Sequence, residues 1–236
     1  MADREAKGEV TMAETGYAGR SVLVFGAAGA LGGGLAAAFA AAGATVTGAD
    51  RHPPRDGWGL DGVRYHQVDV LDDAALGNLF REEPVPWAVV NTVGGFAPHT
   101  RLDALDQDEL TAQLNLNLVT AALVTKHALA ALRRAGEGRI VHTASRAAQV
   151  TRGQGFAYSV SKLGVLHLVA MAADETRGTA ITVNCVVPTF IDTPANRAAM
   201  PDADHKSWPK VDDIARAYLF LASPQAHLVS GAAIPV

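Results

Sequence analysis

The chain has 236 residues, of which 49% are hydrophobic and 19% charged, and its formal net charge is -4; this is the composition of an ordinary globular protein, and without a basic run it argues against nucleic acid as the main partner. A single cysteine, Cys185, excludes a disulfide framework within the chain and fits a reducing cytoplasm, where we expect the protein to act. The eight histidines are scattered without the spacing of metal ligands, so no metal site is expected.

Short apolar segments alternate with helical patterns along the chain. Residues 1–19 are polar and charged and are predicted to be a mobile extension. Strands are predicted at residues 21–25, 45–49, 64–69, 87–91, 139–143, 181–187 and 232–236, and helices at residues 31–42, 74–81, 108–134, 157–177 and 211–221. Strands that are apolar on both faces and alternate with helices predict a parallel sheet covered on each side. We therefore expect an α/β fold, a doubly wound Rossmann-type sheet in a single domain over residues 20–236.

One uncharged stretch, residues 30–49, has the length of a membrane span. Alanine and glycine dominate it, however, and it ends in the strand-like Thr45-Val46-Thr47. Residues 1–20 lack the apolar core of a secretory signal. We therefore expect no membrane partner.

A glycine-rich turn directly follows the first predicted strand. Gly26, Gly29 and Gly32 stand in the sequence Gly-Ala-Ala-Gly-Ala-Leu-Gly, and Ala30 and Leu31 lie where the next helix begins. Glycine allows a tight turn and lets the backbone approach a pyrophosphate, while the helix N-terminus offers free N–H groups and the positive end of its dipole. This strand–turn–helix context predicts a dinucleotide site. The alternative is a plain turn in a chain rich in alanine and glycine.

The second predicted strand is followed by Asp50 and Arg51. An acidic side chain at this spacing from the turn accepts hydrogen bonds from an adenosine ribose and repels a 2′-phosphate, which favours NAD(H). Arg51 could instead bind that phosphate through its guanidinium, so NADP(H) is the second possibility.

Tyr158 and Lys162 are one turn apart in a predicted helix and therefore share a face. A tyrosine with an ordinary pKa near 10 is a poor base at neutral pH. A close ammonium group and an oxidised nicotinamide would stabilise the phenolate, so that the tyrosine can act as a general acid or base. Ser145 follows the strand at residues 139–143, where its hydroxyl can hydrogen-bond a substrate carbonyl oxygen. The pair alone would more often be incidental, but together with Ser145 and the glycine-rich turn it predicts a hydride-transferring oxidoreductase.

From Ser21 to Val236 the chain resembles the short-chain dehydrogenase/reductase family. The resemblance implies an active site of Asn117, Ser145, Tyr158 and Lys162, in which the asparagine holds a water that links the lysine to solvent. Asn117 is preferred to Asn115 because Asn117-Leu118 begins an apolar run typical of the family. The resemblance also implies a set of cofactor contacts. Asp69 and Val70 would contact the adenine, and Asn91, Val93 and Gly94 would support the cofactor. Pro188, Ile191 and Thr193 would lie beside the nicotinamide and phosphates, and Tyr158 and Lys162 would contact the cofactor as well.

Several positions depart from the family pattern. Phe25 replaces the usual threonine before the first glycine, Ala30 replaces the middle glycine, and Pro188-Thr189 replaces Pro-Gly. The segment 194–209 is short, and the usual Asp-Gly-Gly ending is missing. These departures, with Val-Gly-Gly after the fourth strand, resemble the dihydropteridine reductases and their bacterial relatives. That branch tends to lack the serine, whereas this chain keeps Ser145.

We therefore expect a ketone reductase with a bulky or flat small-molecule substrate, because Ser145 suits an ordinary carbonyl and a short segment at 194–209 suggests an open pocket. Quinonoid dihydropteridine reduction is the close alternative, and a nucleotide-binding regulator without turnover is the alternative of another class. An epimerase or dehydratase would need a further acid or base and a larger substrate domain. The apolar surplus of the helices at 108–134 and 157–177 predicts a homodimer or homotetramer.

Overall fold

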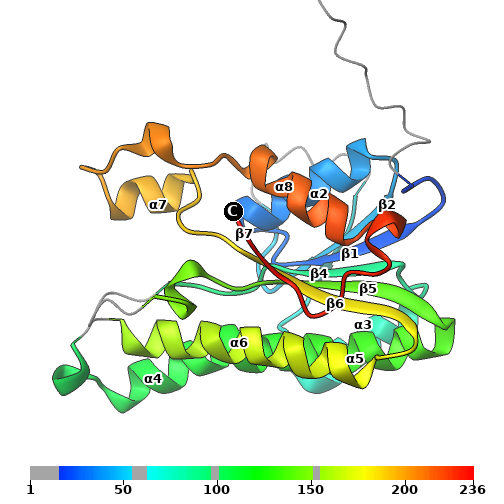
Figure 1. Cartoon of the computed structure of the whole chain (residues 1–236), viewed down its shortest axis with the longest axis horizontal. Coiled ribbons are helices and arrows are strands. Elements are labelled where there is room, and N and C mark those ends of the chain that lie inside the picture. The colour runs from blue at the N-terminus through cyan, green and yellow to red at the C-terminus, as the bar shows by residue number, and fades with distance from the viewer. Residues whose placement is uncertain (1–15, 55–62, 97–100, 151–154) are drawn as a thin grey trace, which may run out of the picture.

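A parallel sheet crosses the centre of the molecule, with helices on both faces (Figure 1). The computed structural model describes residues 16–54, 63–96, 101–150 and 155–236. The strands are β1 (Ser21–Phe25), β2 (Thr45–Asp50), β3 (Arg64–Gln67), β4 (Ala88–Asn91), β5 (Glu137–Thr143), β6 (Ala180–Val187) and β7 (Ala233–Pro235). Their order in the sheet is β3-β2-β1-β4-β5-β6-β7, and each neighbouring pair is parallel. The prediction of a doubly wound α/β domain is confirmed.

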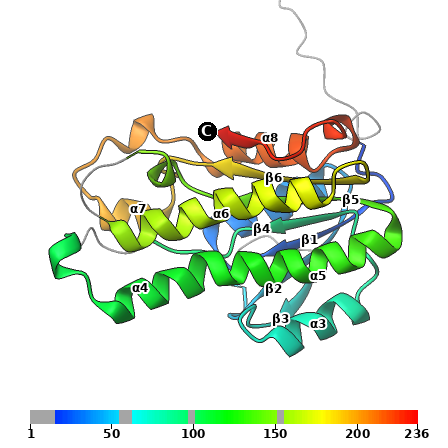
Figure 2. The ribbon, with the colours of Figure 1, turned by 60° about the horizontal axis from the view of Figure 1, so that its bottom comes forward.

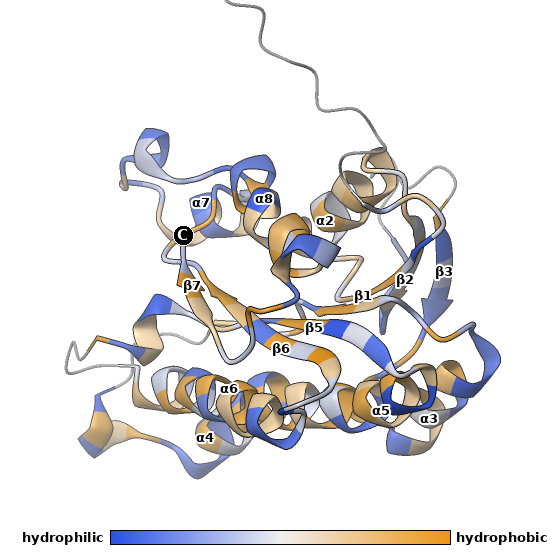
Figure 3. Cartoon of the chain, turned by 45° about the vertical axis from the view of Figure 1, so that its right-hand side comes forward, coloured by the Kyte–Doolittle hydropathy of each residue, from blue (hydrophilic) through white to orange (hydrophobic). Residues whose placement is uncertain are grey.

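Two helical layers cover the sheet (Figure 2). Helices α2 (Ala30–Ala41) and α8 (Val211–Leu221) pack on one face, and α3 (Asp73–Glu82), α5 (Thr120–Ala135) and α6 (Phe156–Glu175) pack on the other. Each face of the sheet has its own hydrophobic core, and strand β1 contributes to both. Val22 and Val24 pack in the core under α2 and α8, whereas Leu23 and Phe25 pack in the core under α3, α5 and α6. This is why its sequence is apolar without alternation, and Figure 3 shows the hydrophobic strands between the two layers.

The segment predicted as a helix at residues 108–134 is helical throughout, but residues 114–119 depart from α-helical geometry. The chain instead forms α4 (Gln107–Gln113), a π-helical segment η2 (Leu114–Val119) and then α5. The backbone N–H of Thr120 bonds to Asn115, five residues back, and the Thr120 hydroxyl donates to the carbonyl of Leu116 at 2.7 Å. Such a segment inserts an extra residue into the helix and is frequent at functional sites.

Short helices not predicted from the sequence occupy the connections. They are α7 (Pro194–Ala199) and the 3₁₀ turns η1 (Leu102–Ala104), η3 (Arg146–Ala148), η4 (His205–Ser207) and η5 (Pro224–Ala226). Helix α7 begins where the Thr193 side chain accepts from the Asn196 N–H at 3.2 Å, and Pro194 fills its first turn. Hydrophobic periodicity does not predict these helices, because three to six residues are too few to show an apolar repeat.

The folded part of the chain begins before residue 20. Tyr17 is buried, its ring meets Phe39 edge-on at 5.3 Å, and its hydroxyl donates to the carbonyl of Leu219 at 2.5 Å. The expected boundary at residue 19 therefore falls inside the domain, and residues 1–15 of the expected extension lie outside the described residues.

The uncharged stretch at residues 30–49 folds into α2 and β2. Among the described residues, helix α6 is long and apolar enough to cross a membrane by length and composition. Val165, Val169 and Ala172 of this helix are buried in the core beneath the sheet. A core helix passes the same test of length and composition, so the test says little about α6.

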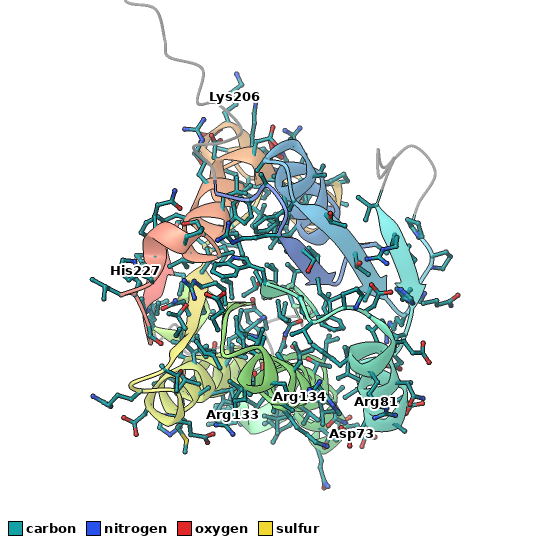
Figure 4. The ribbon with its side chains drawn as sticks, turned by 90° about the vertical axis from the view of Figure 1, so that its right-hand side faces the viewer. Asp73, Arg81, Arg133, Arg134, Lys206 and His227 are labelled. Atoms are coloured by element: carbon teal, nitrogen blue, oxygen red, sulfur yellow. The ribbon has the colours of Figure 1, made fainter. Side chains whose placement is uncertain are left out.

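Helices α3, α5 and α6 form the lower helical layer, and charged side chains gather on its outer surface (Figure 4). Asp73 of α3 bonds Lys126 of α5 at 2.6 Å and His127 at 2.8 Å. These pairs tie α3 to α5 at the surface, where ion pairs contribute little to stability.

Candidate active site

A cavity of about 470 Å³ lies at the carboxyl ends of β1, β2 and β4. Strand β1 has β2 on one side and β4 on the other, so the strand order reverses here. Crevices at such a switch point bind ligands in open α/β sheets. Eight predicted cofactor residues line the cavity: Gly26, Gly29, Asp50, Arg51, Asp69, Val70, Val93 and Gly94.

The glycine-rich turn has the close packing expected of a phosphate cradle. Gly26 adopts a φ of +80°, and a Cβ there would lie 2.5 Å from the Thr92 hydroxyl. A Cβ on Gly32 would lie 2.1 Å from the carbonyl oxygen of Gly26, so this glycine brings α2 onto the turn rather than lining the cavity. Helix α2 begins after Gly29 with no side-chain cap and no acidic residue in its first turn. Its first N–H groups and dipole therefore suit a pyrophosphate.

Asp50 is fixed at the cavity wall by the turn itself. Its carboxylate accepts from the N–H of Ala28 at 3.2 Å and from the N–H of His52 at 3.0 Å. Arg51 is exposed, and its Nε donates to the His52 ring at 3.1 Å. Asp50 and Arg51 thus both lie at the cavity, and backbone N–H groups hold the Asp50 carboxylate in place.

A buried chain of hydrogen bonds orients Asn91 at the end of β4. The Asn91 Oδ1 accepts from the N–H of Val93 at 3.1 Å, and its Nδ2 lies 3.3 Å from Nδ1 of His142. The other ring nitrogen of His142 lies 2.8 Å from the Thr125 hydroxyl, which donates to the carbonyl of Ala121. Only a neutral His142 ring that is protonated at Nε2 gives every group in this chain of hydrogen bonds a matching donor or acceptor. Burial, with Lys162 adding to it, lowers the pKa of His142 to about 4, which keeps the ring neutral.

Asn117 lies in the π-helical segment and clamps the turn that follows Asn91. Its Oδ1 accepts from the N–H of Gly95 at 3.0 Å, and its Nδ2 lies 3.1 Å from the carbonyl of Gly95. The same nitrogen lies 3.1 Å from Gln113 and from the Ser161 hydroxyl. Asn117 is buried, whereas Asn115 is exposed.

Lys162 reaches the site from α6 and is buried. Its Nζ donates to the carbonyl of Thr143, at the end of β5, at 2.9 Å. A Cβ on Gly94 would lie 2.9 Å from this Nζ and 2.7 Å from the Oδ1 of Asn117, so Gly94 fits between the two. Burial lowers the pKa of Lys162 from 10.5 to about 8, although a nearby Cys185 opposes the shift.

Tyr158 lies one turn before Lys162 on α6, as predicted. Burial raises the pKa of its phenol, and a hydrogen bond with Ser145 opposes the rise. Lys162 is not among the groups that shift the phenol pKa in this structure, in which its ammonium group donates to the carbonyl of Thr143. Ser145 also accepts from the N–H of Ala147 at 3.2 Å, which caps η3. The four expected catalytic residues thus lie at the carboxyl edge of the sheet, next to the cavity.

Nine of the predicted cofactor residues do not line the cavity, and three of these, Pro188, Ile191 and Thr193, come from the segment after β6. Their contacts are local, because the carbonyl of Pro188 accepts from Arg146 at 2.9 Å and that of Ile191 accepts from Asn196 at 2.8 Å. Thr193 caps α7. They lie on the segment after β6, at the same edge of the sheet.

Sequence reasoning missed several residues that build the site. Thr143 accepts from Lys162, Gly95 pairs with Asn117, and the Thr92 hydroxyl donates to the carbonyl of Phe25 at 2.7 Å. All three contacts use a backbone atom, which every residue type offers equally. The polar His142 within an apolar strand was the one visible signal of the buried chain.

Comparisons with known proteins find relatives over most of the chain. A family model described as "Enoyl-(Acyl carrier protein) reductase" matches residues 26–236. The chain is 31% identical to D-threitol dehydrogenase of Mycolicibacterium smegmatis, over 91% of this chain and 90% of that protein. It is 30% identical to cis-4-hydroxycyclohexanecarboxylate dehydrogenase of Sinomonas cyclohexanicum, over 93% and 96%. A solved short-chain type dehydrogenase/reductase from Mycobacterium ulcerans superposes with a TM-score of 0.86 at 29% identity, covering 93% of this chain and 89% of that one.

Proposed function

We propose that this chain, which belongs to the short-chain dehydrogenase/reductase family, reduces the carbonyl group of a bulky or flat small-molecule ketone. As a member of that family it is an NAD(P)-dependent oxidoreductase. The pairing of Ser145 with Tyr158, beside a buried Lys162, is the observation that supports the ketone. Two hydroxyl groups that meet at the carboxyl edge of the sheet can both donate to one carbonyl oxygen.

The chemistry divides between the protein and its cofactor, which supplies the hydride when bound. Ser145 and Tyr158 hold the substrate oxygen and so orient the carbonyl carbon toward the cofactor side of the cleft. Because burial raises the pKa of Tyr158, its phenol is protonated at neutral pH and is ready to donate. The proton passes to the carbonyl oxygen as the carbon gains hydride, which leaves a hydroxyl group on the product. To Lys162, one turn along α6, we assign stabilisation of the phenolate that remains.

The cofactor that we propose is NAD(H), with NADP(H) as the alternative. Asp50 supports NAD(H), because its carboxylate stands at the cavity wall where a 2′-phosphate would meet like charge. Arg51 lines the same cavity and is the residue that would serve NADP(H).

Reduction of a quinonoid dihydropteridine is the competing activity. The Val93-Gly94-Gly95 sequence supports it, since it resembles that branch of the family. Ser145 speaks against it, and both relatives described above are named as dehydrogenases of hydroxyl compounds. We therefore rank the ketone first.

We also propose that copies of the chain associate through the lower helical layer. Val119, Leu163 and Met171 on η2 and α6 are exposed although they are large and apolar. Apolar patches on helices commonly mark symmetric interfaces. Light scattering at micromolar concentration tests this, and a monomer would contradict it.

A steady-state screen tests the proposed activity. The protein is mixed with NADH or NADPH and with ketone, quinone and quinonoid pterin substrates, and cofactor oxidation is followed by absorbance. We expect turnover with ketones and a preference for NADH. Turnover confined to the pterin would replace the first activity with the second, and cofactor binding without any turnover would indicate a regulator.

A further inference from the structure

Two hydroxyl groups meet at the end of strand β5. Thr143 Oγ1 lies 2.9 Å from the carbonyl oxygen of Asn91 and 2.7 Å from the hydroxyl of Tyr218, a fully buried residue of α8. The backbone carbonyl of the same Thr143 accepts from the Lys162 ammonium of α6 at 2.9 Å. One strand residue therefore links α8 to α6, which cover opposite faces of the sheet (Figure 1).

The direction of these hydrogen bonds follows from the number of protons. A threonine hydroxyl carries one proton and a carbonyl oxygen can only accept, so Thr143 donates to Asn91. Thr143 Oγ1 then accepts from the Tyr218 hydroxyl. Burial raises the pKa of Tyr218, which keeps this donor protonated. The result is a one-way chain of hydrogen bonds that runs from α8 through β5 to the end of β4.

This chain of hydrogen bonds secures β5 on the side where its backbone pairing has ended. The register of β4 and β5 ends at the pair of Asn91 and His142, one residue before Thr143. Pairing with β6 continues on the other side, where Thr143 lies opposite Val186. The Thr143 hydroxyl therefore replaces the pairing that β4 no longer provides, and it does so at the residue whose carbonyl holds Lys162.

Packing alone does not explain why the pair is polar. Tyr218 belongs to the apolar core under α2 and α8, together with Val24 and Val141. A phenylalanine would fill the same space and would leave no hydroxyl to satisfy, and a buried hydroxyl costs free energy unless it has a partner. Holding a backbone carbonyl in place for a buried cation is a role that an apolar pair could not fill.

We propose that Tyr218 and Thr143 are positioning residues that fix the carbonyl to which the Lys162 ammonium is anchored. Their side chains act through Lys162, to which the proposed reductase activity gives the stabilisation of the Tyr158 phenolate, and in that respect the inference rests on the proposed function. A hydrogen bond from the ammonium to a carbonyl favours the charged form of a lysine. Loss of a fixed anchor should therefore lower the pKa of Lys162.

That pKa can be measured without any turnover. The chain has five lysines, so NMR of protein labelled with [ε-¹³C]lysine can resolve their ε-carbon signals during a pH titration, and Lys162→Met identifies the signal of Lys162. Cys185 on β6 and His142 on β5 interact electrostatically with Lys162, and Tyr158 lies one turn away on α6. These neighbours stay unchanged in the variants that test the anchor.

The variants remove the two hydroxyl groups in steps. We expect the Lys162 signal to titrate near pH 8 in the wild type, about 0.5 lower in Tyr218→Phe, and about 1 lower in Thr143→Val, which removes both hydrogen bonds. Thr143→Ser keeps the hydroxyl and should keep the wild-type midpoint. Tyr17→Phe is the matched control, because it also removes a buried tyrosine hydroxyl that donates to α8, but from a position before β1. It should leave the Lys162 midpoint unchanged.

Turnover provides the second readout. The kcat for ketone reduction should fall about fivefold to tenfold in Thr143→Val and recover in Thr143→Ser, because small displacements of catalytic groups are costly. The same Lys162 midpoint in wild type, Tyr218→Phe and Thr143→Val would overturn the positioning role, as would an equal shift in Tyr17→Phe. If Tyr218→Phe does not fold, the midpoints of Thr143→Val and Thr143→Ser decide the question. Absence of ketone turnover in the wild type, with the shifted midpoints intact, would instead refute the reductase activity.

Discussion

The ammonium group of Lys162 donates to the backbone carbonyl of Thr143 at 2.9 Å, which joins helix α6 to the end of strand β5. This single bond holds a buried cation at the carboxyl edge of the sheet, one helical turn from the phenol of Tyr158. The charge is costly to bury, as the fall of the Lys162 pKa to about 8 indicates. The fold tolerates this cost at the position where the proposed chemistry needs a cation.

Replacement of that cation should separate activity from stability. We expect Lys162→Met to lose turnover but to raise the free energy of unfolding at pH 7 by about 1–3 kcal/mol, because a buried charge is replaced by an apolar side chain of similar length. Urea unfolding at pH 7 and steady-state assays measure the two effects.

The pH dependence provides the control for this variant. The folded pKa of about 8 lies below the ordinary 10.5, so between these values the unfolded chain binds the proton more tightly. Stability from this group therefore rises as the pH rises from 8 to 10.5, and the advantage of Lys162→Met should shrink across that window. An advantage that is the same at pH 7 and pH 10 would contradict a role for the buried charge.

Removal of the Tyr158 hydroxyl should slow the chemical step strongly while cofactor still binds. General acid catalysis contributes roughly 10²–10⁴-fold to rate, and Tyr158→Phe removes the proton donor without changing the ring that Phe96 contacts. We expect kcat to fall within that range and the NADH dissociation constant, measured by fluorescence, to stay within about twofold. Near-normal turnover would remove Tyr158 from the proposed chemistry.

Asp50 should control the choice between the two cofactors. Its carboxylate is held at the cavity wall by the N–H groups of Ala28 and His52. We expect Asp50→Asn to remove the repulsion of a 2′-phosphate and to raise the NADPH/NADH ratio of kcat/KM by about 10- to 100-fold. Arg51→Ala is the matched variant and should move the ratio the other way. A fall of the ratio in Asp50→Asn would show that the carboxylate does not face the ribose.

His142 should make the protein sensitive to acid. Its folded pKa of about 4 lies below the ordinary 6.5, so between these values the unfolded chain binds the proton more tightly. The stability from the neutral ring is complete above pH 6.5 and is lost as the pH falls to 4, by up to about 3 kcal/mol. Urea unfolding at pH 7 and pH 4.5 should show a smaller loss in His142→Asn, whose amide oxygen can still accept from Asn91. An equal loss in both proteins would assign the acid sensitivity to other groups.

Gly94 and Gly95 should differ in what an added methyl group does. In Gly94→Ala the methyl would press on the buried Lys162 ammonium and on Asn117, whereas in Gly95→Ala it would meet the mobile end of the Leu116 side chain. We expect kcat to fall about 10- to 100-fold in Gly94→Ala and less in Gly95→Ala, because small displacements of catalytic groups are costly. Thermal unfolding serves as the control, since comparable losses of Tm with equal kcat would refute the distinction.

The catalytic set illustrates how far sequence reasoning reaches. Tyr158 and Lys162 are one turn apart in any α-helix, so helical geometry alone predicted their common face. The glycine-rich turn was equally predictable from the sequence, because only glycine fits position 26, where φ is +80° and Thr92 packs against the backbone. The π-helical segment was not, since apolar residues at 114–119 fit an α-helix as well.

The sequence by itself determined the alternation of strands and helices, the parallel sheet, the cofactor turn and the residue types of the catalytic set, because these depend on local periodicity and on what each side chain can do. Only the tertiary structure decided which groups meet. Thr143 receives Lys162, Asn117 clamps Gly95, and Phe96 lies against Tyr158. These contacts join segments far apart in the chain, and two of them use backbone atoms, which carry no signature in the sequence. The physical reason is that packing brings them together, and packing is a property of the folded chain as a whole.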